Sequence, residues 1–266
     1  TYMMRNRKPL VVANWKMHLT VAQALSLVRR LDVKIPDGSG VEIVLCSPTI
    51  ALQSLKDEIK QLTASSKLRL GAQTVNEHDE GAFTGEVSAA QLRPLVDMAL
   101  CGHSERRIYV GEKSDVIGRK VAACVRNGIV PILCVGENLH QRESGHGRRT
   151  VVDQLAAGLG HLTKKEVSQV VVAYEPVWAI STTKQSRHAD PVAVEKMLGI
   201  IRDYLEEIYG EANGAHMRVI YGGSVEPDNT AAYLALDGCD GVLVGSASLN
   251  WADFSAIVQK ASATTK

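Results

Sequence analysis

The sequence predicts an α/β protein that forms a single closed (β/α)8 barrel, with residues 1–266 as one domain. Eight short apolar runs alternate with eight helical patterns, the order of a parallel sheet whose strands are separated by helices. Eight repeats favour a closed barrel over a doubly wound open sheet, and no change in composition marks a second domain. The 266 residues also match a barrel, because such folds reach about 250 residues as one unit.

The eight predicted strands are short segments rich in β-branched residues and bounded by polar residues or glycine. They cover residues 10–13, 41–46, 68–73, 98–102, 129–135, 169–174, 217–221 and 241–244. Uninterrupted apolar runs of this length are typical of parallel strands, which are buried on both faces.

The helices predicted after these strands cover residues 21–31, 49–62, 88–96, 114–126, 150–159, 191–209, 229–236 and 251–261. Thr20 is a predicted N-cap, and Pro191 suits the first turn of its helix. Four apolar residues of the first helix are predicted to face the barrel: Ala22, Leu25, Val28 and Leu31.

Composition excludes several classes of protein. Lysine and arginine number 30 against 29 acidic residues and are dispersed, so we expect no nucleic-acid partner. No apolar run approaches the roughly 18 residues of a membrane span, so we expect no membrane contact. The five cysteines lack a CxxC spacing and indicate reduced thiols in a cytoplasmic protein. We expect Thr1 and Tyr2, ahead of Met3 and Met4, to be an added remnant.

A barrel places its active residues at the carboxyl ends of its strands. The residues at these positions are Asn14, Lys16, Gln73, His103, Glu137, Glu175, Gly222, Gly223, Ser224, Gly245 and Ser246. Glu175 follows a buried strand and precedes Pro176, and the next loop starts with apolar residues, as in a lid. A strand-end carboxylate is usually a salt-bridge partner, but a lid beside it favours a general base.

His103 and Lys16 have two interpretations each. A lone histidine is most often a half-buried structural residue. His103, however, precedes a segment that can begin a helix, and a helix N-terminus favours the neutral ring, which can donate a hydrogen bond. Lys16 is either a solvated amine or a cation that holds negative charge, with Glu105 as its partner. We expect Ser104, Glu105 and Cys134 to support these groups.

The two Gly/Ser turns after the seventh and eighth strands predict a phosphate site, because their backbone N–H groups can point at an anion. Tight turns without a ligand are the alternative. No metal-binding spacing, dinucleotide fingerprint or Schiff-base lysine at the end of the sixth strand is present, so we expect no metal and no cofactor. A base, a neutral acid, a cation and a phosphate site together suit proton transfer next to a carbonyl.

Five blocks resemble the triosephosphate isomerase family: residues 13–17, 81–86, 102–107, 173–180 and 221–225. The resemblance covers nearly the whole chain and implies an aldose–ketose isomerase of TIM-barrel fold that interconverts dihydroxyacetone phosphate and D-glyceraldehyde 3-phosphate in glycolysis and gluconeogenesis. It implies Glu175 as the base, His103 as the acid, and Lys16 and Asn14 as stabilisers of negative charge. Phosphate donors would be N–H groups near Ser181, Ser224, Gly245 and Ser246.

The resemblance also implies a homodimer in which the loop carrying Phe83 and Thr84 docks beside the partner's active site. The chain departs from the family pattern at the lid tip, where Ser181 and Thr183 stand in place of glycines. Ser246 likewise replaces a glycine, and residues 185–190 are about two residues longer than usual. Each substitution keeps the backbone N–H group, so we expect phosphate binding to persist.

Two rival functions remain open at this point. An isomerase of a four-carbon ketose phosphate would need the same base and acid with a roomier lid region. A non-catalytic assembly or binding barrel would not need Glu175, His103 or Lys16, and all three are present.

Overall fold

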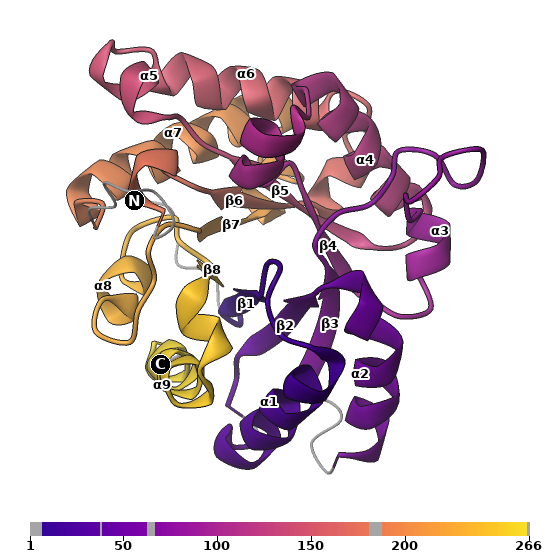
Figure 1. Ribbon diagram of the computed structural model, residues 1–266. Helices are drawn as coiled ribbons and strands as arrows, with labels where there is room; N and C mark the ends of the chain where they lie inside the picture. The colour runs from indigo at the N-terminus through magenta and orange to yellow at the C-terminus, as the bar shows by residue number, and fades with distance from the viewer. Residues whose placement is uncertain (1–6, 38, 63–66, 181–187, 265–266) are drawn as a thin grey trace.

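The structure is a computed structural model that describes residues 7–37, 39–62, 67–180 and 188–264. Its eight strands form one closed barrel in which neighbours in sequence are parallel neighbours in space, and β8 pairs with β1 (Figure 1). The strands are β1 (Leu10–Asn14), β2 (Glu42–Ser47), β3 (Leu68–Ala72), β4 (Met98–Cys101), β5 (Val130–Val135), β6 (Val171–Tyr174), β7 (Arg218–Tyr221) and β8 (Gly241–Val244). The predicted (β/α)8 barrel is therefore confirmed.

Helices surround the barrel (Figure 1). The α-helices are α1 (Val21–Lys34), α2 (Thr49–Gln61), α3 (Ala89–Leu92), α4 (Ser114–Arg126), α5 (Leu139–Glu143), α6 (Gly147–Leu159), α7 (Pro191–Tyr209), α8 (Thr230–Leu234) and α9 (Trp251–Ala263). A π-helical turn, η1 (Arg106–Val110), follows β4. Four 3-10 turns complete the described part: η2 (Glu166–Gln169), η3 (Val177–Ala179), η4 (Gly214–His216) and η5 (Ser246–Leu249).

The structure differs from the helix predictions in two places. The buried face of α1 consists of Ala24, Leu27, Val28 and Leu31, whereas Ala22 is exposed and Leu25 only half-buried. Successive steps of three residues drift around a helix of 3.6 residues per turn, so the predicted set could not share one face. The sequence prediction also missed α5, a short helix that depends on the capping box between Asn138 and Gln141.

The apolar core has two parts, one on each side of the sheet. Inside the barrel lie side chains such as Leu10, Val12, Val171 and Ala173, and between the barrel and the helices lie their alternating neighbours. Because strand side chains alternate between faces, the inward set continues past the strand ends. This alternation directs Asn14 and Glu175 into the mouth of the barrel, along with Gly222 and Gly245, whose lack of a side chain leaves space there.

Candidate active site

Glu175 is held where β6 ends. It continues the inward set of Val171 and Ala173, and its side chain is only 2% exposed. Its backbone N–H donates to the Val135 carbonyl of β5 at 2.8 Å. A Cβ at Gly136 would lie 1.7 Å from the Glu175 carbonyl oxygen, so only glycine allows the two strand ends to approach this closely.

The Glu175 carboxylate has one bonded and one unpaired oxygen. Oε2 accepts a hydrogen bond from the Ser104 backbone N–H at 3.1 Å. Oε1 is buried and lies 3.1 Å from Nε2 of His103, but the ring is not aligned for a hydrogen bond, so this oxygen has no partner among the described residues. A buried, unpaired carboxylate oxygen is costly for folding and well suited to accept a proton.

His103 occupies the position predicted for a neutral imidazole. Gly102 adopts a positive φ of 74°, which turns the chain at the end of β4 and leads into the helical segment that ends in η1. The Glu105 backbone N–H donates to Nδ1 of His103 at 3.3 Å. Since Nδ1 accepts this bond, the ring proton lies on Nε2, which faces Glu175. The geometry thus aims a ring N–H donor into the pocket.

Lys16 is fixed from several directions. Its Nζ forms an ion pair with Oε1 of Glu105 at 2.6 Å, which is the partner expected from the sequence. Its backbone N–H donates to Oδ1 of Asn14 at 3.0 Å, and its carbonyl accepts from the Gln73 side chain at 2.8 Å. Lys16 also has a φ of 52°, a left-handed conformation that costs a non-glycine residue about 1 kcal/mol or more.

The two predicted anion-binding turns lie side by side, since β7 pairs with β8. At Gly223 a Cβ would lie 2.0 Å from the Tyr221 hydroxyl, so the first turn requires glycine. The second turn leads into η5. The backbone N–H of Ser246, the first residue of η5, has no partner within the helix. In this structure Ser224 uses both its N–H and its hydroxyl to bind the Ala179 carbonyl, at 3.1 and 2.8 Å.

A buried carboxylate holds the segment that follows Glu175. Glu137 is fully buried, and its Oε1 accepts hydrogen bonds from Tyr174 at 3.1 Å and Trp178 at 3.2 Å. Arg142 forms an ion pair with the same oxygen at 3.3 Å and stacks over the Trp178 ring at 4.5 Å. Burial raises the pKa of Tyr174, which therefore stays a neutral donor. These contacts fix the chain before residue 181.

The predicted residues largely converge on one pocket at the mouth of the barrel. Its lining is Asn14, Lys16, His103, Glu175, Ile180, Gly222, Gly223, Ser224, Val225, Glu226, Leu243, Gly245 and Ser246. Ser104 and Glu105 stand behind it through their bonds to Glu175 and Lys16. Cys134 lies in the buried layer inside the barrel, and its carbonyl accepts a hydrogen bond from Arg107 at 3.0 Å.

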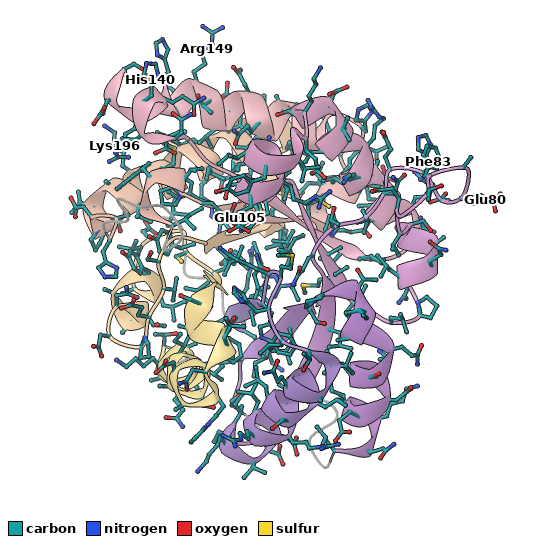
Figure 2. All side chains as sticks on the ribbon, in the orientation of Figure 1. Glu80, Phe83, Glu105, His140, Arg149 and Lys196 are labelled. Carbon is teal, nitrogen blue, oxygen red and sulfur yellow. The ribbon has the colours of Figure 1, made fainter. Side chains whose placement is uncertain are left out.

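Two predicted residues lie away from the pocket, and a third falls outside the described part of the chain. Ser181 is outside the described residues, as is most of the predicted lid. Phe83 and Thr84 are exposed on the loop between β3 and α3, whereas Glu105 lies over the middle of the barrel (Figure 2). Among the described residues no group of three or more His, Cys, Asp or Glu side chains could hold a metal ion. None of the described helices is long and apolar enough to cross a membrane.

Sequence reasoning missed the roles of Glu137, Arg142 and Gly136. Glu137 was visible as a strand-end carboxylate, but its task depends on Trp178, which is 41 positions away. Gly136 directly follows an apolar strand, a signal for close backbone approach. Arg142 gave no signal, because its partner is set by a helix that was not predicted.

The fold and the pocket define a class of protein: a (β/α)8 barrel with a carboxylate, an imidazole donor, a lysine and N–H-rich turns around one small cavity. Residues 9–261 match the triosephosphate isomerase family. The chain belongs to this family.

Similar proteins include three named triosephosphate isomerase. The one from Symbiobacterium thermophilum is 42% identical over 255 residues, which cover 94% of this chain and 96% of the relative. The one from Carboxydothermus hydrogenoformans is 41% identical over 254 residues, or 95% of this chain and 98% of the relative. The one from Clostridium tetani is 38% identical over 253 residues, or 95% and 96%.

Proposed function

We propose that this protein is an aldose–ketose isomerase that interconverts dihydroxyacetone phosphate and D-glyceraldehyde 3-phosphate, a step of glycolysis and gluconeogenesis. Membership of the triosephosphate isomerase family supports the reaction. The observation that carries the mechanism is the buried Oε1 of Glu175, which has no hydrogen-bond partner among the described residues and lies 3.1 Å from Nε2 of His103 in the same pocket as the two N–H-rich turns.

In this mechanism Glu175 is the general base. Oε1 removes a proton from the carbon beside the carbonyl, and the electron pair moves onto the carbonyl oxygen to give an enediolate. The hydroxyl proton moves to the former carbonyl oxygen, the protonated Glu175 returns its proton to the former carbonyl carbon, and the new carbonyl forms where the hydroxyl was, so that the atoms balance. Burial of the carboxylate supports this role, because it keeps water away from the carbon acid and the base during proton transfer.

His103, Lys16 and Asn14 stabilise the negative charge of the enediolate. Nε2–H of His103 donates to the oxygens, while the backbone N–H of Glu105 on Nδ1 keeps the ring in the required tautomer. Lys16 adds a positive charge whose position is set by Glu105, and Asn14 holds the backbone of Lys16. Donors fixed in advance near a developing charge are a large source of rate acceleration.

The substrate phosphate binds between the turns after β7 and β8. The N–H groups of Gly245 and Ser246 at the start of η5 serve as donors, in accord with anion binding at helix N-termini. The N–H of Ser224 is a further donor, once it binds the phosphate in place of the Ala179 carbonyl. Ser181 is proposed as a further donor on family grounds.

We also propose that the protein is a homodimer. The loop with Phe83 and Thr84 is held in shape by stacking of Phe83 on His78, with ring centroids 4.4 Å apart, and Phe83 is 42% exposed. Further exposed apolar side chains belong to the segments after β1, β2 and β4: Met17, Ile50, Ile108, Tyr109 and Val110. Such a collection of exposed apolar groups is typical of an interface.

A cytoplasmic location fits the cysteines. All five are free, and four are buried. Burial raises the pKa of the Cys46 and Cys134 thiols, so these side chains stay protonated and unreactive.

The proposed reaction is tested by comparing kcat/KM for D-glyceraldehyde 3-phosphate with that for tetrulose phosphates. We expect a clear preference for the triose phosphate, because the relatives carry the name of the triose enzyme. A preference for the four-carbon substrates would overturn the proposal in favour of the rival isomerase. Absence of activity on both, in a folded protein, would favour the non-catalytic barrel.

A further inference from the structure

Asn229 connects three segments beside the pocket through one side-chain amide. Its Oδ1 accepts the Glu226 backbone N–H at 2.9 Å. Its Nδ2 donates to the Ser224 carbonyl at 3.0 Å and contacts Nδ1 of His188 at 3.3 Å. The orientation of the amide follows from its partners, because a backbone N–H can only donate and a carbonyl can only accept. Nδ1 of His188 therefore accepts a hydrogen bond from Nδ2 of Asn229.

The position of Asn229 makes this arrangement unusual. Asn229 is the N-cap residue of α8, and an asparagine there ordinarily accepts an N–H from the first turn of its own helix. It makes no such bond. Its oxygen reaches back to Glu226 instead, and the start of α8 is held by Thr230, whose hydroxyl donates to the Glu226 carbonyl at 2.6 Å. The Asn229 side chain thus serves the turn before the helix rather than the helix.

That turn forms one wall of the pocket. Residues Gly222 to Glu226 all line it, and the Asn229 amide bonds to the backbone of two of them. On the pocket side, Ser224 binds the Ala179 carbonyl through two donors. The peptide groups of Ser224 are therefore held from behind by Asn229 and from the front by Ala179.

The chain after residue 187 is fastened to the same unit. Tyr233 of α8 donates its buried hydroxyl to the Ala189 carbonyl at 2.8 Å, and its ring stacks on Tyr221 at 4.1 Å between centroids. The contact between His188 and Asn229 is a second link between this segment and the start of α8. The unit behind the pocket wall thus has support that does not depend on Asn229, which allows the amide to be removed without loss of the fold.

We infer that Asn229 is a positioning residue for anion binding: its amide holds the Ser224–Glu226 turn so that the Ser224 N–H can meet the substrate phosphate. An amide suits this position, because one side chain must accept from one peptide group and donate both to another and to His188. The inference deepens the proposed function and rests on it for the readout of turnover. Asn229 does not contact the reacting atoms in this proposal. Removal of its amide should therefore affect phosphate binding and KM more than kcat.

The test compares Asn229→Ala with wild type in two measurements. Titration calorimetry with inorganic phosphate reports anion binding without turnover, and steady-state kinetics with D-glyceraldehyde 3-phosphate separates KM from kcat. We expect phosphate binding to weaken and KM to rise by about 5- to 30-fold, the effect of one or two lost hydrogen bonds. We expect kcat to fall less than about threefold, because Glu175 and His103 are untouched.

Asn213→Ala is the matched control, since Asn213 also donates to a backbone carbonyl, that of Tyr209, but lies near η4 at the opposite end of the barrel. It should leave both measurements unchanged. His188→Ala removes only the third contact and should change phosphate binding less than twofold. If it reproduces the whole loss, or if Asn229→Ala lowers kcat while phosphate binding stays normal, the assignment to the turn is overturned.

Asn229→Asp covers the case in which the alanine variant fails to fold. Aspartate keeps the acceptor for Glu226 and is a good N-cap residue, but it cannot donate to Ser224. Its added charge is screened at high salt, so a loss of phosphate binding that persists there supports the inference, and recovery to wild-type affinity refutes it. A wild type that binds phosphate without isomerase activity would refute the proposed function alone, because calorimetry still tests Asn229.

Discussion

Replacement of Glu175 by glutamine separates the role of this residue in catalysis from its role in folding. The amide has nearly the same shape and can still accept the Ser104 N–H bond, which is 3.1 Å long in the wild type. What it cannot do is accept a proton from carbon. If Glu175 is the base, kcat should fall by the ~10²–10⁴ of general base catalysis or more, equivalent to roughly 3–5 kcal/mol in the barrier.

Stability should change little in this variant, for two opposing reasons. The substitution removes a buried charge whose Oε1 has no partner, which favours the folded state. The substitution also places an amide NH2 next to a second donor, either the Ser104 N–H or the His103 Nε2–H. Two donors that face each other destabilise the folded state by a similar amount, about 1–3 kcal/mol. We expect the melting temperature to stay within about 4 °C of wild type.

Glu175→Asp tests placement rather than charge. The side chain is shorter by one C–C bond, about 1.5 Å, so the carboxylate can no longer reach both Ser104 and the substrate carbon. A misplacement of about 1 Å can lower the rate roughly 10²-fold even though the base is retained. Both variants would be assayed by a coupled rate measurement and by calorimetric melting. A Gln variant with near-normal kcat, or one that melts far below wild type, would mean that Glu175 is structural.

Three further predictions concern a residue behind the pocket, the predicted interface, and a carboxylate held by two ion pairs after η1. Glu105→Gln should lower kcat/KM by about tenfold in steady-state assays, since the 2.6 Å ion pair that positions the active-site ammonium is lost; unchanged kinetics would contradict this. Thr84→Glu should shift sedimentation from dimer to monomer, because it puts charge at a docking loop; an unchanged dimer would count against that loop. Burial raises the pKa of Glu112, but bonds from Lys120 and Arg106 outweigh it and leave the pKa below its ordinary 4.5. Stability from Glu112 is thus present above pH 4.5 and lost as pH falls through the folded pKa. Glu112→Gln should unfold about 3–5 kcal/mol more easily at pH 7, with a flatter acid dependence in urea titrations.

Much of the fold could be predicted because parallel barrel strands are buried on both faces and read as short apolar runs. All eight strands lie within two residues of their predicted bounds, and α4 and α7 match theirs. The failures are local. α5 is a single polar turn stabilised by the Asn138–Gln141 capping box, and η1 is a π-helical turn with no periodic signal. Neither buries an apolar stripe, which is the signal that sequence periodicity detects.

The sequence predicted which residues lie at the strand ends, but not the role that each of them has in the site. Gln73 and Glu137 belong to the same strand-end set as His103 and Glu175. In the structure Gln73 binds the carbonyls of Lys16 and Cys46, and Glu137 binds Trp178 and Tyr174, so both support the backbone and the rings around the pocket rather than line it.

By itself, the sequence determined the order of the strands, the alternation that turns Asn14 and Glu175 inward, and the two glycine turns after β7 and β8, because these depend only on residue type and spacing along the chain. Only the tertiary structure decided which strand ends meet, since closure of the barrel brings together residues far apart in sequence. It also decided that the Glu105 backbone sets the tautomer of His103, and that Asn229 supports Ser224. These are contacts of a few ångströms between segments whose separation no periodicity encodes.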